Sequence, residues 1–167
     1  MPRRFLIVLP LLLIACAGPA GQQPTGELPD ALAKSQATRE AAGLFDFTSF
    51  TKLEVEGPGA LRALQWMTDN EMDKPPGSVT YTQMLNARGG IEADLTMTRL
   101  APERFFIVTG SAFGVHDLDW IRRHLPLDGA AYAHDVTSSR ACLGLWGPAA
   151  RDILGTVTRD DVSNAGF

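Results

Sequence analysis

The stretch that most constrains the fold is QMLNARGGIEADLTMTRL, residues 83–100. It has the pattern of two short strands joined by a turn at Gly89 and Gly90, because glycine adopts the positive φ values that a tight turn requires. Successive side chains of a strand point to opposite faces. We therefore expect a β-hairpin from Val79 to Arg99, with one apolar face directed at a core.

The polar face of this hairpin has two interpretations, a solvent-facing surface or a ligand-binding site. Centring the turn between Arg88 and Gly89 sets the pairing. The expected pairs are Leu85 with Glu92, Gln83 with Asp94, and Tyr81 with Thr96. Tyr81 and Asp94 then become diagonal neighbours, about 7–8 Å apart at Cα, and a phenol and a carboxylate at that spacing can flank one small polar ligand. Solvent exposure of the whole face is the alternative. The opposite, apolar face would carry Met84, Ala93, Leu95 and Met97.

The segments around the hairpin alternate between strand and helix patterns. Strands are expected within residues 49–57, 104–110 and 140–148, and helices within residues 57–70, 112–126 and 147–157. Residues 104–110, RFFIVTG, are continuously apolar and predict a central strand. The sequence therefore predicts an α+β fold with a mostly antiparallel sheet and helices packed on one side.

The first 16 residues differ in kind from the rest. Arg3 and Arg4 precede an apolar run that is too short to span a membrane, which predicts a secretory signal peptide. The letters LIAC resemble the lipobox of bacterial lipoproteins, in which the cysteine is lipidated. Cys16 is therefore a candidate lipidation site, and a membrane-anchored or periplasmic location is expected. A mis-assigned start, with a cytoplasmic protein, is the alternative.

The composition of the chain indicates its domain organisation and argues against several classes of function. Residues 17–36 are rich in Gly, Pro and Gln without an apolar period, which predicts a flexible linker before one domain at residues 37–167. The net charge of −4 argues against a nucleic-acid partner. Two cysteines without a CxxC motif and three scattered histidines argue against a metal site or a disulfide framework.

Other bulky or reactive side chains have structural interpretations. Asp117 and Asp119 are expected on a solvated helix face, and Cys142 as a buried thiol in an apolar strand. Core positions are expected at Trp66, Val115, Leu118, Trp120 or Ile121, Leu125 and Trp146, and surface or capping positions at His116, His124 and His134.

From about Thr38 to Phe167 the chain resembles the folate-binding aminomethyltransferase family, the T-protein of the glycine cleavage system. It is also similar to the folate-binding portion of dimethylglycine and sarcosine dehydrogenases. The motif LNARGGIEADL resembles the family signature Asn-Glu-x-Gly-Gly-Ile-x-x-Asp-Leu. It departs from that signature at Ala87, where the family has Glu, and at Ala93, where the T-protein has a second Asp.

The resemblance implies a tetrahydrofolate site on the hairpin. Asp94 matches the family acid beside the folate nitrogens, Tyr81 matches a pocket tyrosine, and Thr109 and Gly110 lie where the following strand passes the pterin. The implied reaction is attack of a folate nitrogen on a methylene iminium, giving 5,10-methylenetetrahydrofolate, with the iminium supplied by a small amine-derived one-carbon donor. A carboxylate suits this reaction because it accepts the proton and stabilises an adjacent cation.

The resemblance covers the first part of the family fold, so residues 37–167 are expected to form a truncated folate-binding domain. No Gly-x-Gly-x-x-Gly motif follows an early strand, so no flavin domain is expected in these residues. A flavin domain or another subunit outside this chain is a candidate partner. Two functions stay open. One is a one-carbon transfer module with aminomethyltransferase-like activity, and the other is a non-catalytic, lipid-anchored remnant of the same fold.

Overall fold

The structure, a computed structural model, describes residues 28–166. The predicted signal peptide with Cys16, and the linker up to residue 27, lie outside the described residues. Among the helices of the described residues, none combines the length and the apolar character needed to cross a membrane.

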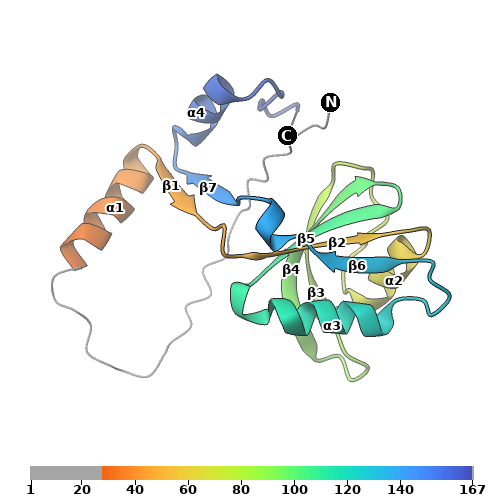
Figure 1. Cartoon of the computed structure of the whole chain (residues 1–167). Coiled ribbons are helices and arrows are strands. Elements are labelled where there is room, and N and C mark those ends of the chain that lie inside the picture. The colour runs from red at the N-terminus through yellow and green to blue at the C-terminus, as the bar shows by residue number, and fades with distance from the viewer. Residues whose placement is uncertain (1–27, 167) are drawn as a thin grey trace. The chain divides into compact units, whose positions relative to one another are not determined.

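Two compact units make up the described chain (Figure 1). We call residues 48–141 the sheet unit, and residues 28–47 with 142–166 the two-segment unit. The single domain expected over residues 37–167 stays a prediction, and within it the structure has these two compact units. The division follows the strand pairing, because the strands of each unit hydrogen-bond within their own sheet.

The sheet unit contains a five-stranded sheet in the order β3-β4-β5-β2-β6 (Figure 1). The strands are β2 Thr51–Glu56, β3 Val79–Leu85, β4 Ile91–Ala101, β5 Arg104–Thr109 and β6 Tyr132–Asp135. Every neighbouring pair is antiparallel, and β5 is the central strand, as predicted. Strand β6 was not anticipated, because its four residues, YAHD, show no strong apolar pattern.

The core lies between one face of this sheet and two helices, α2 Ala60–Met67 and α3 Gly114–His124. Short 3₁₀ turns, η1 Ser111–Phe113 and η2 Thr137–Ser139, lead into α3 and out of β6. The fully buried core side chains include Leu53, Val55, Leu64, Met84, Ile107 and Ile121. This arrangement confirms the predicted α+β class with helices on one side of the sheet.

Three side chains of the helices lie opposite to expectation. Trp66 is 71% exposed and Val115 is 88% exposed, whereas Asp117 is 1% exposed. The helical period explains the α3 pair, because Asp117 lies one turn before the buried Ile121 and shares its side of the helix. Val115 lies about 120° around the axis from Ile121 and points outward.

The two-segment unit pairs β1 Gly43–Asp46 with β7 Leu143–Trp146 and adds helices α1 Leu28–Glu40 and α4 Ala150–Val157. Strand β7 and helix α4 agree with the sequence analysis, although Cys142 and Trp146 are half-buried rather than buried. The expected linker is corrected over residues 28–36, which are helical. This segment is rich in strong helix formers, and Asp30 and Arg39 at its ends complement the helix dipole.

Gly57 and Gly89 give a matched test of the fold. Both have positive φ, 120° and 76°, but a Cβ at Gly57 would collide with the Ala130 carbonyl oxygen, whereas one at Gly89 would meet open space. We expect Gly89→Ala to lower the free energy of unfolding by about 1–2 kcal/mol, the cost of left-handed backbone. Gly57→Ala should cost more, because a backbone oxygen cannot swing aside.

Urea unfolding of both variants checks this expectation. Equal losses of stability for Gly57→Ala and Gly89→Ala would show that the close approach at Gly57 is absent in solution.

Candidate functional site

The hairpin of β3 and β4 has the predicted pairing over most of its length. Tyr81 pairs with Thr96 and Gln83 with Asp94, as expected. The pairing predicted for Leu85 is wrong: its partner is Ile91 instead of Glu92, because the register shifts by one residue after Met84. The shift is confined to the loop end of the hairpin and leaves the Asp94 position unchanged.

Asn86 is the physical reason for this shift. Its side-chain oxygen accepts hydrogen bonds from the backbone N–H groups of Arg88 and Gly90, both at 2.9 Å, and its amide nitrogen donates to Glu92 at 2.7 Å. The Asn86 side chain thus supplies hydrogen-bond partners for loop N–H groups that would, in a two-residue turn, bond to the backbone of the opposite strand. The loop therefore spans residues 86–90 and is wider than the predicted turn.

The two faces of the hairpin separate as alternation predicts. Met84, Ala93, Leu95 and Met97 are all buried. On the other face the Tyr81 hydroxyl donates a hydrogen bond of 2.6 Å to Asp94 Oδ2, and Tyr81 stays 47% exposed. The structure therefore brings together the phenol and the carboxylate that the sequence analysis proposed as a pair.

The hydrogen bond to Asp94 raises the pKa of Tyr81, since ionising the phenol would break that bond and place two negative charges together. The phenol is thus a hydrogen-bond donor at neutral pH. Asp94, which accepts this bond, is half-buried on the polar face.

The outer edge of β3 is covered by residues 69–70. Asp69 Oδ1 accepts hydrogen bonds from the Gln83 N–H at 3.0 Å and from the Thr82 hydroxyl at 2.7 Å. These two bonds lower the pKa of Asp69. The Asn70 side chain donates to the Tyr81 carbonyl oxygen at 2.9 Å. The strand that presents Tyr81 is therefore fixed along both of its edges.

The other two predicted site residues lie at the end of β5. Thr109 pairs with Leu95, and its hydroxyl is buried on the core face, where it donates to Asp117 Oδ2 at 2.6 Å. The structure therefore does not bring the Thr109 side chain to Asp94. Extending the same register by one residue places Gly110, which has extended backbone, opposite Asp94.

Sequence reasoning missed Asp117 and its partner. Asp117 Oδ1 lies 2.9 Å from His116 Nδ1, and His116 Nε2 lies 3.7 Å from Glu92 Oε2. The signal was present, because Asp117 precedes Ile121, one of the two alternative core positions predicted there, by one helical turn. A carboxylate at a core-facing position requires polar partners.

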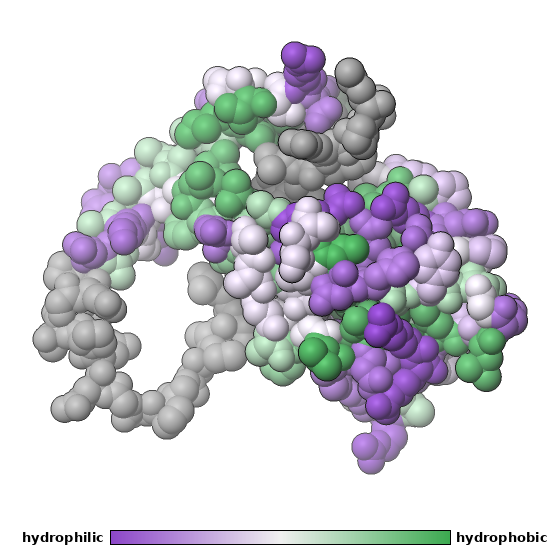
Figure 2. Space-filling view, in the orientation of Figure 1, coloured by the Kyte–Doolittle hydropathy of each residue, from purple (hydrophilic) through white to green (hydrophobic). Residues whose placement is uncertain are grey.

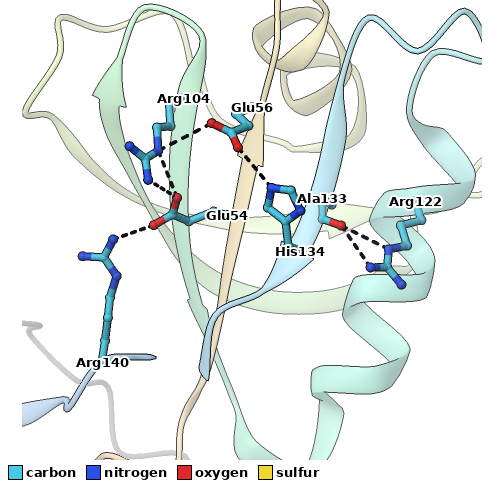
Figure 3. Close-up of polar contacts among 7 residues, drawn as sticks. All are labelled: Glu54, Glu56, Arg104, Arg122, Ala133, His134 and Arg140. Carbon is cyan, nitrogen blue, oxygen red and sulfur yellow. Dashed lines mark hydrogen bonds and ion pairs between the residues drawn. The ribbon is translucent and has the colours of Figure 1, made fainter. Parts of the chain in front are cut away.

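Figure 3 shows a second polar cluster around Glu54. It lies on the same sheet face as Asp94, because Glu54 pairs with Phe106, which pairs with Thr98, four residues after Asp94 on β4. Glu54, whose side chain is 5% exposed, accepts hydrogen bonds from Arg104, with Nε at 2.9 Å, and from Arg140 at 2.6 Å. Burial opposes ionisation of Glu54, but the hydrogen bonds and charges of the two arginines outweigh it, so the pKa of Glu54 is lowered. The cluster continues with Glu56 and His134, where His134 Nε2 lies 3.1 Å from Glu56 Oε1.

The rest of the sheet unit adds little further chemistry. Its visible surface is mainly hydrophilic, with scattered apolar residues (Figure 2). Across residues 28–166, no group of three or more His, Cys, Asp or Glu side chains is placed to hold a metal ion. The site that combines exposure, opposed donor and acceptor groups and a fixed backbone is the Tyr81–Asp94 pair.

Comparison with known families decides the relationship. Residues 27–167 match the family model of the GCVT N-terminal domain. The chain belongs to this family. It is the aminomethyltransferase family that the hairpin motif indicated, and its members bind tetrahydrofolate.

Three similar proteins illustrate the family. The mitochondrial pyruvate dehydrogenase phosphatase regulatory subunit of Mus musculus is 38% identical over 118 residues, 70% of this chain and 13% of that protein. Mitochondrial sarcosine dehydrogenase of Mus musculus is 35% identical over 147 residues, 78% of this chain and 16% of that protein. The crystal structure of glycine cleavage system aminomethyltransferase T from Bartonella henselae has a TM-score of 0.69 and 30% identity, covering 75% of this chain and 34% of that chain.

The chain thus spans about a third or less of the length of these relatives. The shared part is the first portion of the aminomethyltransferase fold, in agreement with the predicted fold.

The Tyr81–Asp94 contact can be tested by titration, because the chain has two tyrosines, Tyr81 and Tyr132. In a Tyr132→Phe background, ultraviolet difference spectroscopy reports Tyr81 alone. We expect the pKa of Tyr81 to lie above that of free tyrosine and to fall when Asp94→Asn removes the charged acceptor. Asp119→Asn, an exposed carboxylate on α3, is the control. An unchanged titration in Asp94→Asn would contradict the contact.

Glu54 predicts a pH-dependent contribution to stability. Its pKa is lower in the folded chain than in the unfolded chain, so its stabilisation is complete above the unfolded pKa and is lost as pH falls through the folded pKa. Glu54→Gln should cost about 1–3 kcal/mol at neutral pH, toward the lower end because both arginines are partly exposed.

Unfolding measurements from about pH 7 to about pH 3 check this. The difference in free energy of unfolding between the wild type and Glu54→Gln should become smaller below about pH 4. A gap that stays constant with pH would show that the charge of Glu54 is not responsible.

Proposed function

We propose that this chain binds tetrahydrofolate on the polar face of the β3–β4 hairpin and serves one-carbon transfer through Asp94. The observation that carries the proposal is the 2.6 Å hydrogen bond from the Tyr81 hydroxyl to Asp94 Oδ2 on a half-exposed sheet face. Membership of a tetrahydrofolate-binding family supports it.

The residues at the site fit a reduced pterin. Asp94 retains acceptor capacity beyond the bond from Tyr81, because an ionised carboxylate has about four lone-pair positions. That capacity suits the N–H groups of a pterin ring. Gly110 has no side chain, so a flat ring can approach the end of β5 closely.

Tetrahydrofolate, when bound, would supply the secondary amine that accepts a one-carbon unit. The Asp94 carboxylate would accept the proton that this amine releases, and its negative charge would stabilise a neighbouring cation. Tyr81 would orient Asp94 through its hydrogen bond. The hairpin suits this task because its backbone is fixed by β5 on one side and by Asp69 and Asn70 on the other.

The one-carbon donor would be a small amine-derived molecule, as the name of the relative sarcosine dehydrogenase suggests. Because the chain spans 16% of the length of sarcosine dehydrogenase, we propose that other parts of the site, such as a flavin domain or another subunit, come from outside these residues.

Calorimetric titration of the whole chain with tetrahydrofolate, kept reduced, tests the proposal. We expect saturable binding that Asp94→Asn weakens by about 10- to 100-fold, the value of a hydrogen bond to a charged group. Tyr81→Phe should weaken it less, because it removes a bond to the carboxylate and leaves the carboxylate itself in place.

Asp119→Asn is the matched control, since it removes an exposed carboxylate whose partner is Arg123 on the same helix. Equal affinities of the Asp94→Asn and Asp119→Asn variants would place any folate site elsewhere.

The second candidate is a non-catalytic binding module, which the similarity to a regulatory subunit favours. In that case Asp94→Asn would alter binding, but the chain would support no one-carbon transfer with any amine-derived donor. A lipid-anchored form of this module would carry its modification at Cys16, and mass measurement of the N-terminal peptide would detect it.

A further inference from the structure

We propose that His116 is a positioning residue that fixes the hairpin loop next to Asp94 in a proton-dependent manner. The consequence for ligand affinity rests on the proposed tetrahydrofolate site. The proposal comes from a chain of contacts that joins α3, the end of β5 and the tip of the hairpin.

The chain of contacts begins at a buried carboxylate. Asp117 is 1% exposed and uses both of its oxygens, Oδ2 for the Thr109 hydroxyl at 2.6 Å and Oδ1 for His116 Nδ1 at 2.9 Å. A buried carboxylate with two hydrogen-bond donors is held in one orientation. Asp117 thereby fixes the His116 ring against the last residue of β5.

The orientation of the ring decides what its other nitrogen does. Nδ1 faces a carboxylate, so it carries the proton when the ring is neutral, and Nε2 then has a lone pair. That lone pair faces Glu92 Oε2 at 3.7 Å. Two acceptors repel each other, whereas a protonated ring donates a hydrogen bond to Asp117 and forms an ion pair with Glu92. Asp117 and Glu92 are the charged groups within ion-pair distance of His116 in the described chain.

Glu92 transmits this difference to the loop. Its Oε1 accepts a hydrogen bond from the Asn86 amide at 2.7 Å, and the Asn86 oxygen holds the N–H groups of Arg88 and Gly90. Glu92 also lies two residues before Asp94 on the same strand. Protonation of His116 therefore tightens the segment from which Asp94 projects.

Amide hydrogen exchange on the unliganded whole chain tests this step directly. We expect the protection factor of the Gly90 amide to be about two- to fivefold higher at about pH 5.5 than at about pH 7.5, the range expected for a partly exposed ion pair. High salt should reduce the difference.

His116→Gln and Glu92→Gln should abolish the difference. His124→Gln is the matched control, because His124 lies on the same helix and contacts the Trp120 carbonyl oxygen rather than a carboxylate. All three substituted side chains are exposed or half-buried, and glutamine at position 116 keeps an N–H group that can donate to Asp117. A pH dependence that survives in His116→Gln would overturn the proposal.

Tetrahydrofolate titrations at the same two pH values provide the second readout. Relative to His124→Gln, the wild type should gain affinity at low pH and His116→Gln should not. If the amide effect is present but affinity changes equally in both variants, the positioning role is overturned. If the amide effect is present and no variant binds at either pH, the contact chain stands and the proposed function fails.

Discussion

The antiparallel register that holds β4 between β3 and β5 is the constraint on which the sheet unit depends. Because side chains alternate along a strand, this register decides at once which β4 residues enter the core and which face away. A slip of one residue would bury Asp94 and expose Leu95. Burial of Leu95 and Met97 therefore stabilises the register that places Asp94 on the opposite face. The packing of the core in this way fixes the geometry of the polar face.

Asp117 shows how the structure meets the cost of a charge in its interior. An unpaired buried carboxylate is strongly unfavourable, so the fold depends on the Thr109 hydroxyl and the His116 ring to satisfy it. Glu54 is satisfied differently, by two arginines that keep contact with water. The first arrangement fixes elements to one another, and the second neutralises a charge on the sheet face.

The sequence predicted the parts of the fold that follow from strong periodicity. The hairpin pairing, the central strand β5 and the helices α2 and α3 follow alternation or helical spacing closely. The pairing of Leu85 with Ile91 instead of Glu92 depends on the side-chain hydrogen bonds of Asn86, and hydrophobic periodicity gives no sign of such bonds. Strand β6 and helix α1 lack an apolar pattern, so their states depend on pairing and propensity.

The candidate site divides in the same way. Tyr81 and Asp94 lie together because they occupy one face of a regular hairpin. Thr109 was placed by resemblance alone, and its side chain lies on the opposite face because it has the parity of the core residue Ile107 on β5. Asp117 was assigned to solvent because acidic residues usually are, although its spacing from Ile121 indicated the core.

The close approach of the two ends of the sheet unit has a consequence for the order of folding during synthesis. The Val136 N–H donates to the Lys52 carbonyl oxygen at 2.8 Å, so the chain enters and leaves the sheet unit at neighbouring points. Strand β1 leaves the ribosome before the sheet unit, whereas its partner β7 follows it. Before residues 48–141 fold, pairing β1 with β7 closes a long flexible loop and loses much chain entropy. Once they have folded, the free segments between β1 and β7 are short, so little further entropy is lost when the two strands pair.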